Sequence, residues 1–290
     1  LSDGPPAATL ATARGKRRPA IGAMMPVCPS AVEMPAPMTT TLETAMPTAA
    51  DAIAGRTGRI DWAAVATALD RQGSAILPGL LVPDDCATIS GLYPDDSRFR
   101  SHVVMARHGF GQGAYKYFAR PLPDLVAALR GRIYPHLAAI ANGWAARMGL
   151  DDRYPDDHAS FLARCHAAGQ IRPTPLLLEY GPGDYNCLHQ DLYGALAFPL
   201  QLAVLLSRPG TEAAVAAGDA DFSGGEFVLT EQRPRMQSRA EVVPLGQGDA
   251  VVFAVNQRPV RGTRGDYRVT MRHGVSRVRA GRRHTLGIIF

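Results

Sequence analysis

The spacing of apolar residues changes near residue 175. Before that point, apolar residues recur at steps of three or four, which predicts helices over residues 62–72, 83–93 and 123–148. Asp61 can cap the first of these helices, and a short strand over residues 74–77 separates the first helix from the second. We therefore expect the first half of the chain to supply helices that support a different structure in the second half.

Beyond residue 175, apolar runs of strand length alternate with short turns. These runs predict strands over residues 176–180, 193–206, 222–229, 242–245, 250–255 and 267–271. The run over residues 193–206 is almost entirely apolar, which is typical of a strand that is buried on both faces. We interpret residues 209–220 as a loop of small residues and residues 256–266 as a basic loop. Many strands joined by short turns favour two facing sheets closed into a jelly roll.

The fold class predicted by these elements is α+β, with a mainly β core and supporting N-terminal helices. Residues 1–55 are rich in Ala, Pro, Thr and Met and show no regular period, which predicts a disordered N-terminal extension. Residues 56–290 are then a single domain, with helical support over 56–170 and the β core over 171–290.

Composition is that of an ordinary globular protein, with 46% hydrophobic and 20% charged residues. The longest apolar run falls well short of the roughly 20 residues that cross a bilayer, so we expect no membrane partner. The four cysteines lack close paired spacing, which indicates reduced thiols in a cytoplasmic protein. A net charge of +5 and a pI of about 9.2 allow a polyanionic partner without requiring one.

Candidate chemistry begins with His189 and Asp191, which follow an apolar run and a Gly-Pro-Gly turn. On an extended strand, residues two apart point to the same face. An imidazole and a carboxylate make up two thirds of the facial triad that holds non-haem Fe(II). A His-x-Asp pair alone is common, but the end of the chain adds His273, then Arg283 at 283 − 273 = 10 positions further on, and then Thr285.

This five-residue pattern resembles that of the Fe(II)/2-oxoglutarate-dependent dioxygenases of the prolyl-hydroxylase and AlkB type, over about residues 175–290. The chain also resembles a bacterial branch with a proposed role in oxidative repair of damaged nucleic acid. The resemblance implies a double-stranded β-helix, which is a form of jelly roll. It also implies Fe(II) as the metal, with 2-oxoglutarate and O2 as cosubstrates.

The resemblance assigns roles to particular residues. Fe(II) would be held by His189, Asp191 and His273. A guanidinium can bind a carboxylate with two parallel hydrogen bonds, which suits Arg283 to the distal carboxylate of 2-oxoglutarate. Thr285 lies two residues along the same strand and can add a hydroxyl donor. Tyr180 or Tyr185 would give a phenolic contact to the cosubstrate.

The implied reaction hydroxylates a C–H bond and releases succinate and CO2. On an N-methylated base, the product would lose formaldehyde, which amounts to oxidative demethylation of alkylated nucleic acid. The same centre would serve a hydroxylase of protein or peptide side chains of the prolyl type, or one that acts on a small metabolite. A further alternative is a non-catalytic nucleic-acid-binding module in which the histidines and the aspartate merely pack.

Two basic regions bear on the substrate. Residues 99–120 alternate glycines with aromatic and basic side chains, which suits either a mobile flap over a flat or anionic ligand or a solvated hairpin. If this segment contacts damaged or single-stranded nucleic acid, the candidate residues are Arg107, Tyr115, Lys116 and Tyr117. The arginines between Arg258 and Arg283 would form either an electrostatic track for a phosphate backbone or the wet face of the last strands.

Overall fold

The computed structural model describes residues 48–192 and 194–290. Most of the predicted extension lies outside these residues, so its disorder stays a prediction, as does the division into domains. Its predicted boundary at residue 55 is wrong, because helix α1 (Ala49–Thr57) crosses it. Thr48 and Asp51 form a reciprocal capping box at the start of this helix, which provides a start signal that composition alone did not reveal.

The predicted helical support is confirmed. It comprises α2 (Trp62–Gln72), α3 (Pro83–Ser90), α4 (Asp124–Arg147) and α5 (His158–Ala167), with β1 (Ser74–Leu77) between the first two. The Asp61 carboxylate accepts a hydrogen bond from the amide of Ala64, as expected of an N-cap. Helix α4 packs against α1, and its buried face meets one face of a large sheet.

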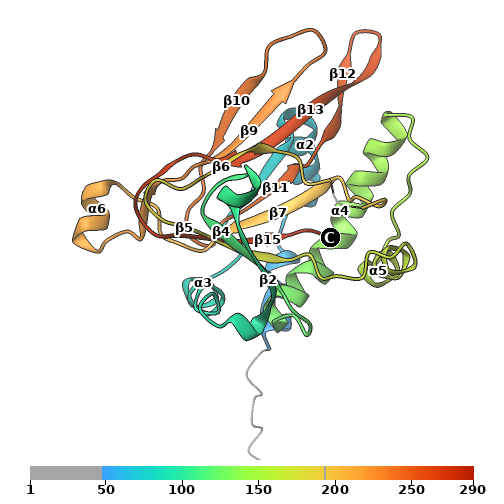
Figure 1. Cartoon of the computed structure of the whole chain (residues 1–290). Helices are drawn as coiled ribbons and strands as arrows, with labels where there is room; N and C mark the ends of the chain where they lie inside the picture. The colour runs from blue at the N-terminus through green and yellow to red at the C-terminus, as the bar shows by residue number, and fades with distance from the viewer. Residues whose placement is uncertain (1–47, 193) are drawn as a thin grey trace, which may run out of the picture. The chain divides into compact units, whose positions relative to one another are not determined.

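That large sheet is antiparallel and has seven strands. Their order is β1, β11 (Ala250–Ala254), β7 (Leu200–Leu205), β15 (Arg283–Ile288), β5 (Leu176–Tyr180), β4 (Ala114–Phe118) and β2 (Phe99–Val104). In its central strands, alternate residues such as Leu177, Leu286 and Ile288 join the main hydrophobic core. The residues between them line a cavity together with residues of the second sheet. Figure 1 shows the strands of the two sheets.

The second sheet has the order β10 (Arg239–Val243), β9 (Phe227–Gln232), β13 (Gly265–Val275), β6 (Tyr185–His189) and β3 (Gly111–Gln112), with β12 (Gln257–Gly262) also paired to β13. A short two-stranded sheet joins β8 (Phe222–Gly224) to β14 (Val278–Gly281). In Figure 1, the β9–β10 and β12–β13 hairpins extend together beyond the rest of the second sheet.

The pairing of eight strands is nested. Strand β5 pairs with β15, β6 with β13, β7 with β11 and β9 with β10, all antiparallel. The first strand of the set therefore lies beside the last, and each inner pair is enclosed by an outer one across the two sheets. This is the topology of a double-stranded β-helix, so the predicted jelly roll is confirmed.

Three predictions about local elements are wrong. The apolar run predicted as a strand over residues 193–206 forms only β7 from residue 200, just after Pro199. The predicted small-residue loop contains helix α6 (Glu212–Ala217), because alanines favour a helix once Thr211 caps it. The predicted basic loop over 256–266 is β12 and its turn, which pair with β13.

Among the described residues, no helix is long and apolar enough to cross a membrane. The three cysteines in this part of the chain, Cys86, Cys165 and Cys187, are free thiols, in agreement with the sequence-based expectation.

Candidate active site

A cavity of about 220 Å³ lies between the two sheets. Strands β5, β7 and β15 of the large sheet form one wall, and β6, β9 and β13 of the second sheet form the other. Strand β4 closes one side with its aromatic side chains. The sequence-predicted residues that line this cavity are His189, Asp191, His273, Arg283, Thr285, Tyr180, Tyr115 and Tyr117.

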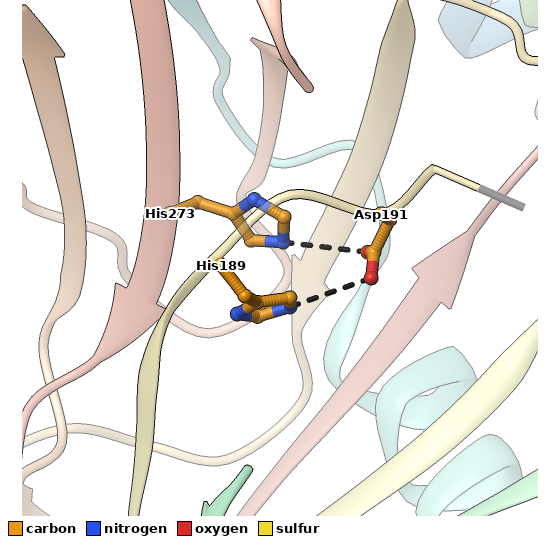
Figure 2. Close-up of side chains that lie close together, drawn as sticks. All are labelled: His189, Asp191 and His273. Carbon is orange, nitrogen blue, oxygen red and sulfur yellow. Dashed lines mark ion pairs between the residues drawn. The ribbon is translucent and has the colours of Figure 1, made fainter.

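The two histidines come from neighbouring strands. His189 ends β6 and is the direct cross-strand partner of His273 in β13, so their rings lie with centroids 4.2 Å apart. Asp191 follows two residues after the end of β6, and its carboxylate lies beside the two rings and faces both of them (Figure 2). Its Oδ1 is 3.4 Å from His189 Nε2, and its Oδ2 is 3.4 Å from His273 Nε2. One ligand atom from each of the three residues lies within 4.8 Å of the other two.

Hydrogen bonds orient this set of ligands. His189 Nδ1 is 2.7 Å from the carbonyl oxygen of Cys187 and donates to it, so Nε2 is the nitrogen that can bind a metal once it has lost its proton. Gln190 holds the connection to Asp191, because its amide donates to Asn256 Oδ1 and to the carbonyl of Met271 in β13. Two imidazole nitrogens and one carboxylate oxygen on one side of a cavity fit Fe(II), which keeps its remaining positions open.

The protonation states follow from burial and from mutual contact. Burial opposes the ionisation of Asp191, but hydrogen bonds from both histidines prevail and hold its pKa well below the ordinary value. Burial also opposes the charged form of His189, yet contact with Asp191 raises the pKa of this histidine. For His273 burial dominates and lowers the pKa, which favours the neutral imidazole that a metal requires.

Arg283 projects into the same cavity from β15 and is only 1% exposed. Its Nη1 donates to Thr285 Oγ1 at 2.6 Å, while its Nε has no hydrogen-bond partner among the described residues. Burial lowers the pKa of Arg283 to about 10. Gly225 permits this placement, since a Cβ there would lie 2.9 Å from Arg283 Cδ. A buried guanidinium without an acidic partner, close to the triad, fits the distal carboxylate of 2-oxoglutarate.

The two candidate tyrosines are placed differently. Tyr180 is fully buried in the cavity wall, with its ring 5.5 Å from the Arg283 guanidinium. Its hydroxyl has no hydrogen-bond partner in the part of the chain that the structure describes. Tyr185 is exposed on β6 and is not part of the cavity wall. Between the two, Tyr180 is therefore positioned for a phenolic contact with the cosubstrate.

The predicted flap is the β2–β4 hairpin, and it divides the candidate substrate residues. Tyr115 and Tyr117 line the cavity, with their rings edge to face at 5.5 Å. Lys116 points to the opposite face of β4, where its ammonium group donates to Asp96 and to the carbonyl of Tyr93. Arg107 is exposed in the turn before β3 and does not line the cavity. Neither Lys116 nor Arg107 therefore lines the cavity, and their contact with a substrate stays a prediction.

The cavity wall also contains residues that sequence reasoning missed, among them Phe110, Asn186 and Gln201. Phe110 and Asn186 come from the flap and from β6, and nothing in their sequence context distinguishes them. Gln201 is a single polar residue in the otherwise apolar strand β7, and it is 4% exposed. A lone amide inside a buried apolar strand is a signal that could have identified this position.

The arginines of the last strands do not form one continuous track. Arg258 is completely buried and forms an ion pair with Glu231 in β9. Arg283 faces the cavity, whereas its neighbour Arg282, just before β15, is exposed and pairs with Glu179. Of the arginines between these positions, those at the surface are Arg261, Arg264, Arg268, Arg272, Arg277 and Arg279.

Comparison with known proteins places this geometry in a family. Residues 113–290 match the model of the Oxygenase-NA family, described as "Oxygenase, catalysing oxidative methylation of damaged DNA". Two uncharacterized proteins of Mycobacterium tuberculosis, MT2286 and Rv2227, are each 46% identical over 195 residues, which cover 67% of this chain and 77% of theirs.

Solved structures with a similar arrangement include a Pseudomonas putida prolyl-4-hydroxylase, with a TM-score of 0.47 and 15% identity over 79% of this chain and 97% of that one. Another is a 2OG-Fe(II) oxygenase family oxidoreductase of Burkholderia pseudomallei, with a TM-score of 0.43 and 16% identity over 80% of this chain and 91% of the other.

The family match covers the whole β core together with β4 and α4, and the relatives share nearly half of the aligned residues. The cavity within that core holds a His-Asp-His group suited to Fe(II) and a buried arginine suited to 2-oxoglutarate. The chain therefore belongs to the Oxygenase-NA family, a family of oxygenases.

Proposed function

We propose that this enzyme removes methyl groups oxidatively from damaged nucleic acid. In this proposal, His189, Asp191 and His273 hold Fe(II), and Arg283, Thr285 and Tyr180 anchor 2-oxoglutarate. The observation that carries the proposal is the convergence of three metal-ligating side chains and one unpaired guanidinium on a single cavity of the double-stranded β-helix. The predicted cytoplasmic location stays a prediction.

The direction of the reaction follows from its cosubstrates. Neither O2 nor 2-oxoglutarate carries a methyl group to donate, so this chemistry on a methylated base removes the methyl group. Fe(II) and 2-oxoglutarate, when bound, supply the oxidation, in which one oxygen atom enters succinate and the other enters the substrate C–H bond. The resulting N-hydroxymethyl group loses formaldehyde and returns the N–H of the base. The non-catalytic alternative is set aside, because the chain belongs to a family of oxygenases.

The protein's own residues bind, orient and desolvate the reactants. Arg283 is a permanent cation at the buried end of the cavity and fixes the direction in which the cosubstrate lies. The apolar wall, which includes Phe227 and Phe253, excludes water from the reacting atoms. Tyr115, Tyr117 and Phe110 present aromatic surfaces to a flat ligand. A base reaches this cavity only if it is single-stranded or flipped out of a duplex.

A coupled turnover assay tests the proposal. The enzyme is loaded anaerobically with Fe(II), given 2-oxoglutarate and oxygen, and assayed for succinate with a panel of N-methylated oligonucleotides and a panel of peptides. We expect succinate and formaldehyde in equal amounts with one or more oligonucleotides. Coupled turnover with peptides alone would instead establish a side-chain hydroxylase, and uncoupled turnover with both panels would indicate a small metabolite.

The site assignment needs its own test, independent of turnover. Co(II) in place of Fe(II) reports its ligands through its visible absorption, so His273→Ala should weaken binding and alter the spectrum. The matched control is His102→Ala, which removes an exposed histidine on β2 outside the cavity. An unchanged Co(II) spectrum in His273→Ala would remove this histidine from the metal site.

A further inference from the structure

A second cavity, of about 450 Å³, adjoins the candidate active site. Its wall comes from β2, β4, α4, α5 and the segment that follows α5. The ring of Tyr117 lines both cavities, so at that point one side chain separates them. A ligand held in the second cavity is therefore next to a ligand held in the first.

The second cavity is positively charged. Arg100, Arg130 and Arg172 line it, and no aspartate or glutamate does. Within residues 48–192 and 194–290, none of these arginines forms an ion pair with an acidic side chain. Three guanidinium groups without counter-ions around one cavity favour an anionic ligand.

Arg130 contributes a buried positive charge to the wall of this cavity. The residue is 4% exposed and projects from α4. Its Nη2 donates to Thr174 Oγ1 at 2.8 Å, but its Nε has no partner among the described residues. Burial lowers the pKa of Arg130 to about 10. A buried cation with an unsatisfied N–H lowers stability unless a bound anion completes its hydrogen bonds.

Arg100 is held in place beside Tyr117. Its guanidinium carbon lies 4.3 Å from the centroid of the Tyr117 ring, and its Nε donates to the carbonyl of Pro173 at 2.8 Å. These two contacts fix the plane of the guanidinium and leave its two Nη groups for a ligand. Arg172 is exposed at the mouth of the cavity and supplies the third positive charge.

We propose that the second cavity binds a backbone phosphate of the nucleic-acid strand whose damaged base occupies the active-site cavity. The inference rests on the proposed function and extends it to how the strand is held. A phosphodiester has oxygen acceptors that point in several directions, whereas the two oxygens of a carboxylate lie in one plane. Three guanidinium groups around one cavity therefore suit a phosphodiester better than they suit a carboxylate. Within a nucleotide the base and the phosphate are separated by one sugar, which matches two cavities separated by one side chain.

The test uses single-stranded oligodeoxynucleotides that carry one N-methylated adenine. Each phosphate near the lesion is replaced in turn by a neutral methylphosphonate, and the dissociation constant is measured. For the wild-type enzyme, we expect one linkage at which this change weakens binding about tenfold, as for the loss of a charge-assisted hydrogen bond. Arg172→Gln and Arg100→Gln should bind the fully charged strand more weakly and should show a smaller further loss at that same linkage, because fewer guanidinium groups remain to contact the phosphate.

The control is Arg71→Gln, which removes an exposed arginine that lacks an ion pair and lies outside both cavities. It lowers net charge by the same amount and should keep the wild-type response at every linkage. Thermal unfolding confirms that each variant is folded. If Arg100→Gln does not fold, the exposed position of Arg172 still carries the test.

The possible outcomes separate this inference from the function on which it rests. Suppose that the wild-type enzyme demethylates oligonucleotides but that the losses of binding free energy from the arginine substitution and from the methylphosphonate simply add. The phosphate site is then wrong and the proposed function stands. If the wild-type enzyme acts on none of the oligonucleotides and is coupled only to a peptide, both proposals are wrong. If Arg71→Gln also weakens the response to the methylphosphonate at that linkage, the effect comes from net charge alone, and the phosphate site is wrong.

Discussion

Two buried arginines, Arg258 in β12 and Arg283 in β15, differ in whether the protein supplies a partner for their charge. Both are almost inaccessible to solvent, with exposures of 0% and 1%. Arg258 forms an ion pair with Glu231 and donates to the carbonyls of Asp70 and Arg71. Arg283 has no acidic partner in the described chain, and its one hydrogen bond is to Thr285.

The difference teaches how to recognise a functional cation in a fold. A charge that the protein itself neutralises, such as Arg258, fastens β12 to β9 and to the end of α2. A charge that is buried without a partner destabilises the free protein and is completed only when an anion binds. Arg283 and Arg130 both belong to this second class, and each lines a cavity.

The largest expected effect concerns the paired arginine. Arg258→Met removes the buried partner of Glu231, which keeps only the more exposed Arg233 and Arg239. We therefore expect a loss of about 3 kcal/mol in the free energy of unfolding. Urea denaturation measures this loss. The double variant Arg258→Met, Glu231→Leu should recover most of the stability, because it removes both charges. If the double variant is as unstable as the single one, the carbonyl contacts of Arg258 matter more than the ion pair.

For the unpaired arginine the expectation is reversed. Arg283→Met should reduce succinate formation at low 2-oxoglutarate by roughly 10- to 100-fold, because a charge-assisted contact to the cosubstrate is lost. The melting temperature should stay the same or rise, since no partner is left unpaired. Arg282→Met, one residue away and exposed, is the matched control and should keep the wild-type KM. A marked fall in the melting temperature of Arg283→Met would show that Arg283, like Arg258, stabilises the fold.

Arg130 can be tested through its neighbour His158. Burial, and after it the charge of Arg130, lowers the pKa of His158 to about 3 from an ordinary 6.5. Between these values the unfolded chain binds a proton that the folded chain does not, so stability falls as pH decreases, by up to about 1.4 kcal/mol per pH unit. Urea denaturation over this interval should show a shallower pH dependence in His158→Phe.

A second variant isolates the contribution of Arg130 to this pH dependence. Arg130→Met removes the neighbouring charge, so the pKa of His158 should rise and the interval over which stability is lost should narrow. Asp157 at the helix cap acts in the opposite direction and remains in both proteins. An unchanged pH profile in Arg130→Met would mean that the charge of Arg130 is already neutralised in the free protein.

The smallest expected effect concerns Thr285. Its hydroxyl accepts from Arg283 at 2.6 Å and orients the guanidinium within the cavity. Thr285→Val keeps the shape but removes this bond, which should raise the KM for 2-oxoglutarate about three- to tenfold, in line with the loss of one hydrogen bond. An unaltered KM would show that packing alone holds Arg283 in position.

Short-range patterns predicted much of this molecule. The helix over residues 62–72 and the strand that follows it are confirmed at both ends, because an N-cap and a glycine mark them. His189 and His273 lie side by side, because His189 ends β6, His273 lies in β13, and the nested topology pairs these two strands. Arg283 and Thr285 also line the cavity together, as alternation along β15 predicts.

Long-range contacts explain what the sequence did not reveal. Nothing local distinguishes Arg258, whose partner Glu231 lies 27 positions away on another hairpin, from the exposed arginines around it. Lys116 seemed a candidate for substrate contact because it stands between two tyrosines, but alternation along β4 places it on the other face. The second cavity combines α4, α5 and two strands, and no motif links them in the sequence.

The nested pairing has a consequence for how the enzyme is assembled. Strand β15 follows all of its neighbours in the sequence, yet it lies in the middle of the large sheet, between β7 and β5. The earlier strands leave a gap in the sheet until β15 pairs with them, and such distant pairing is intrinsically slow to form. A chain shortened before residue 283 would lack both this central strand and the proposed anchor for 2-oxoglutarate, so we expect it to be inactive.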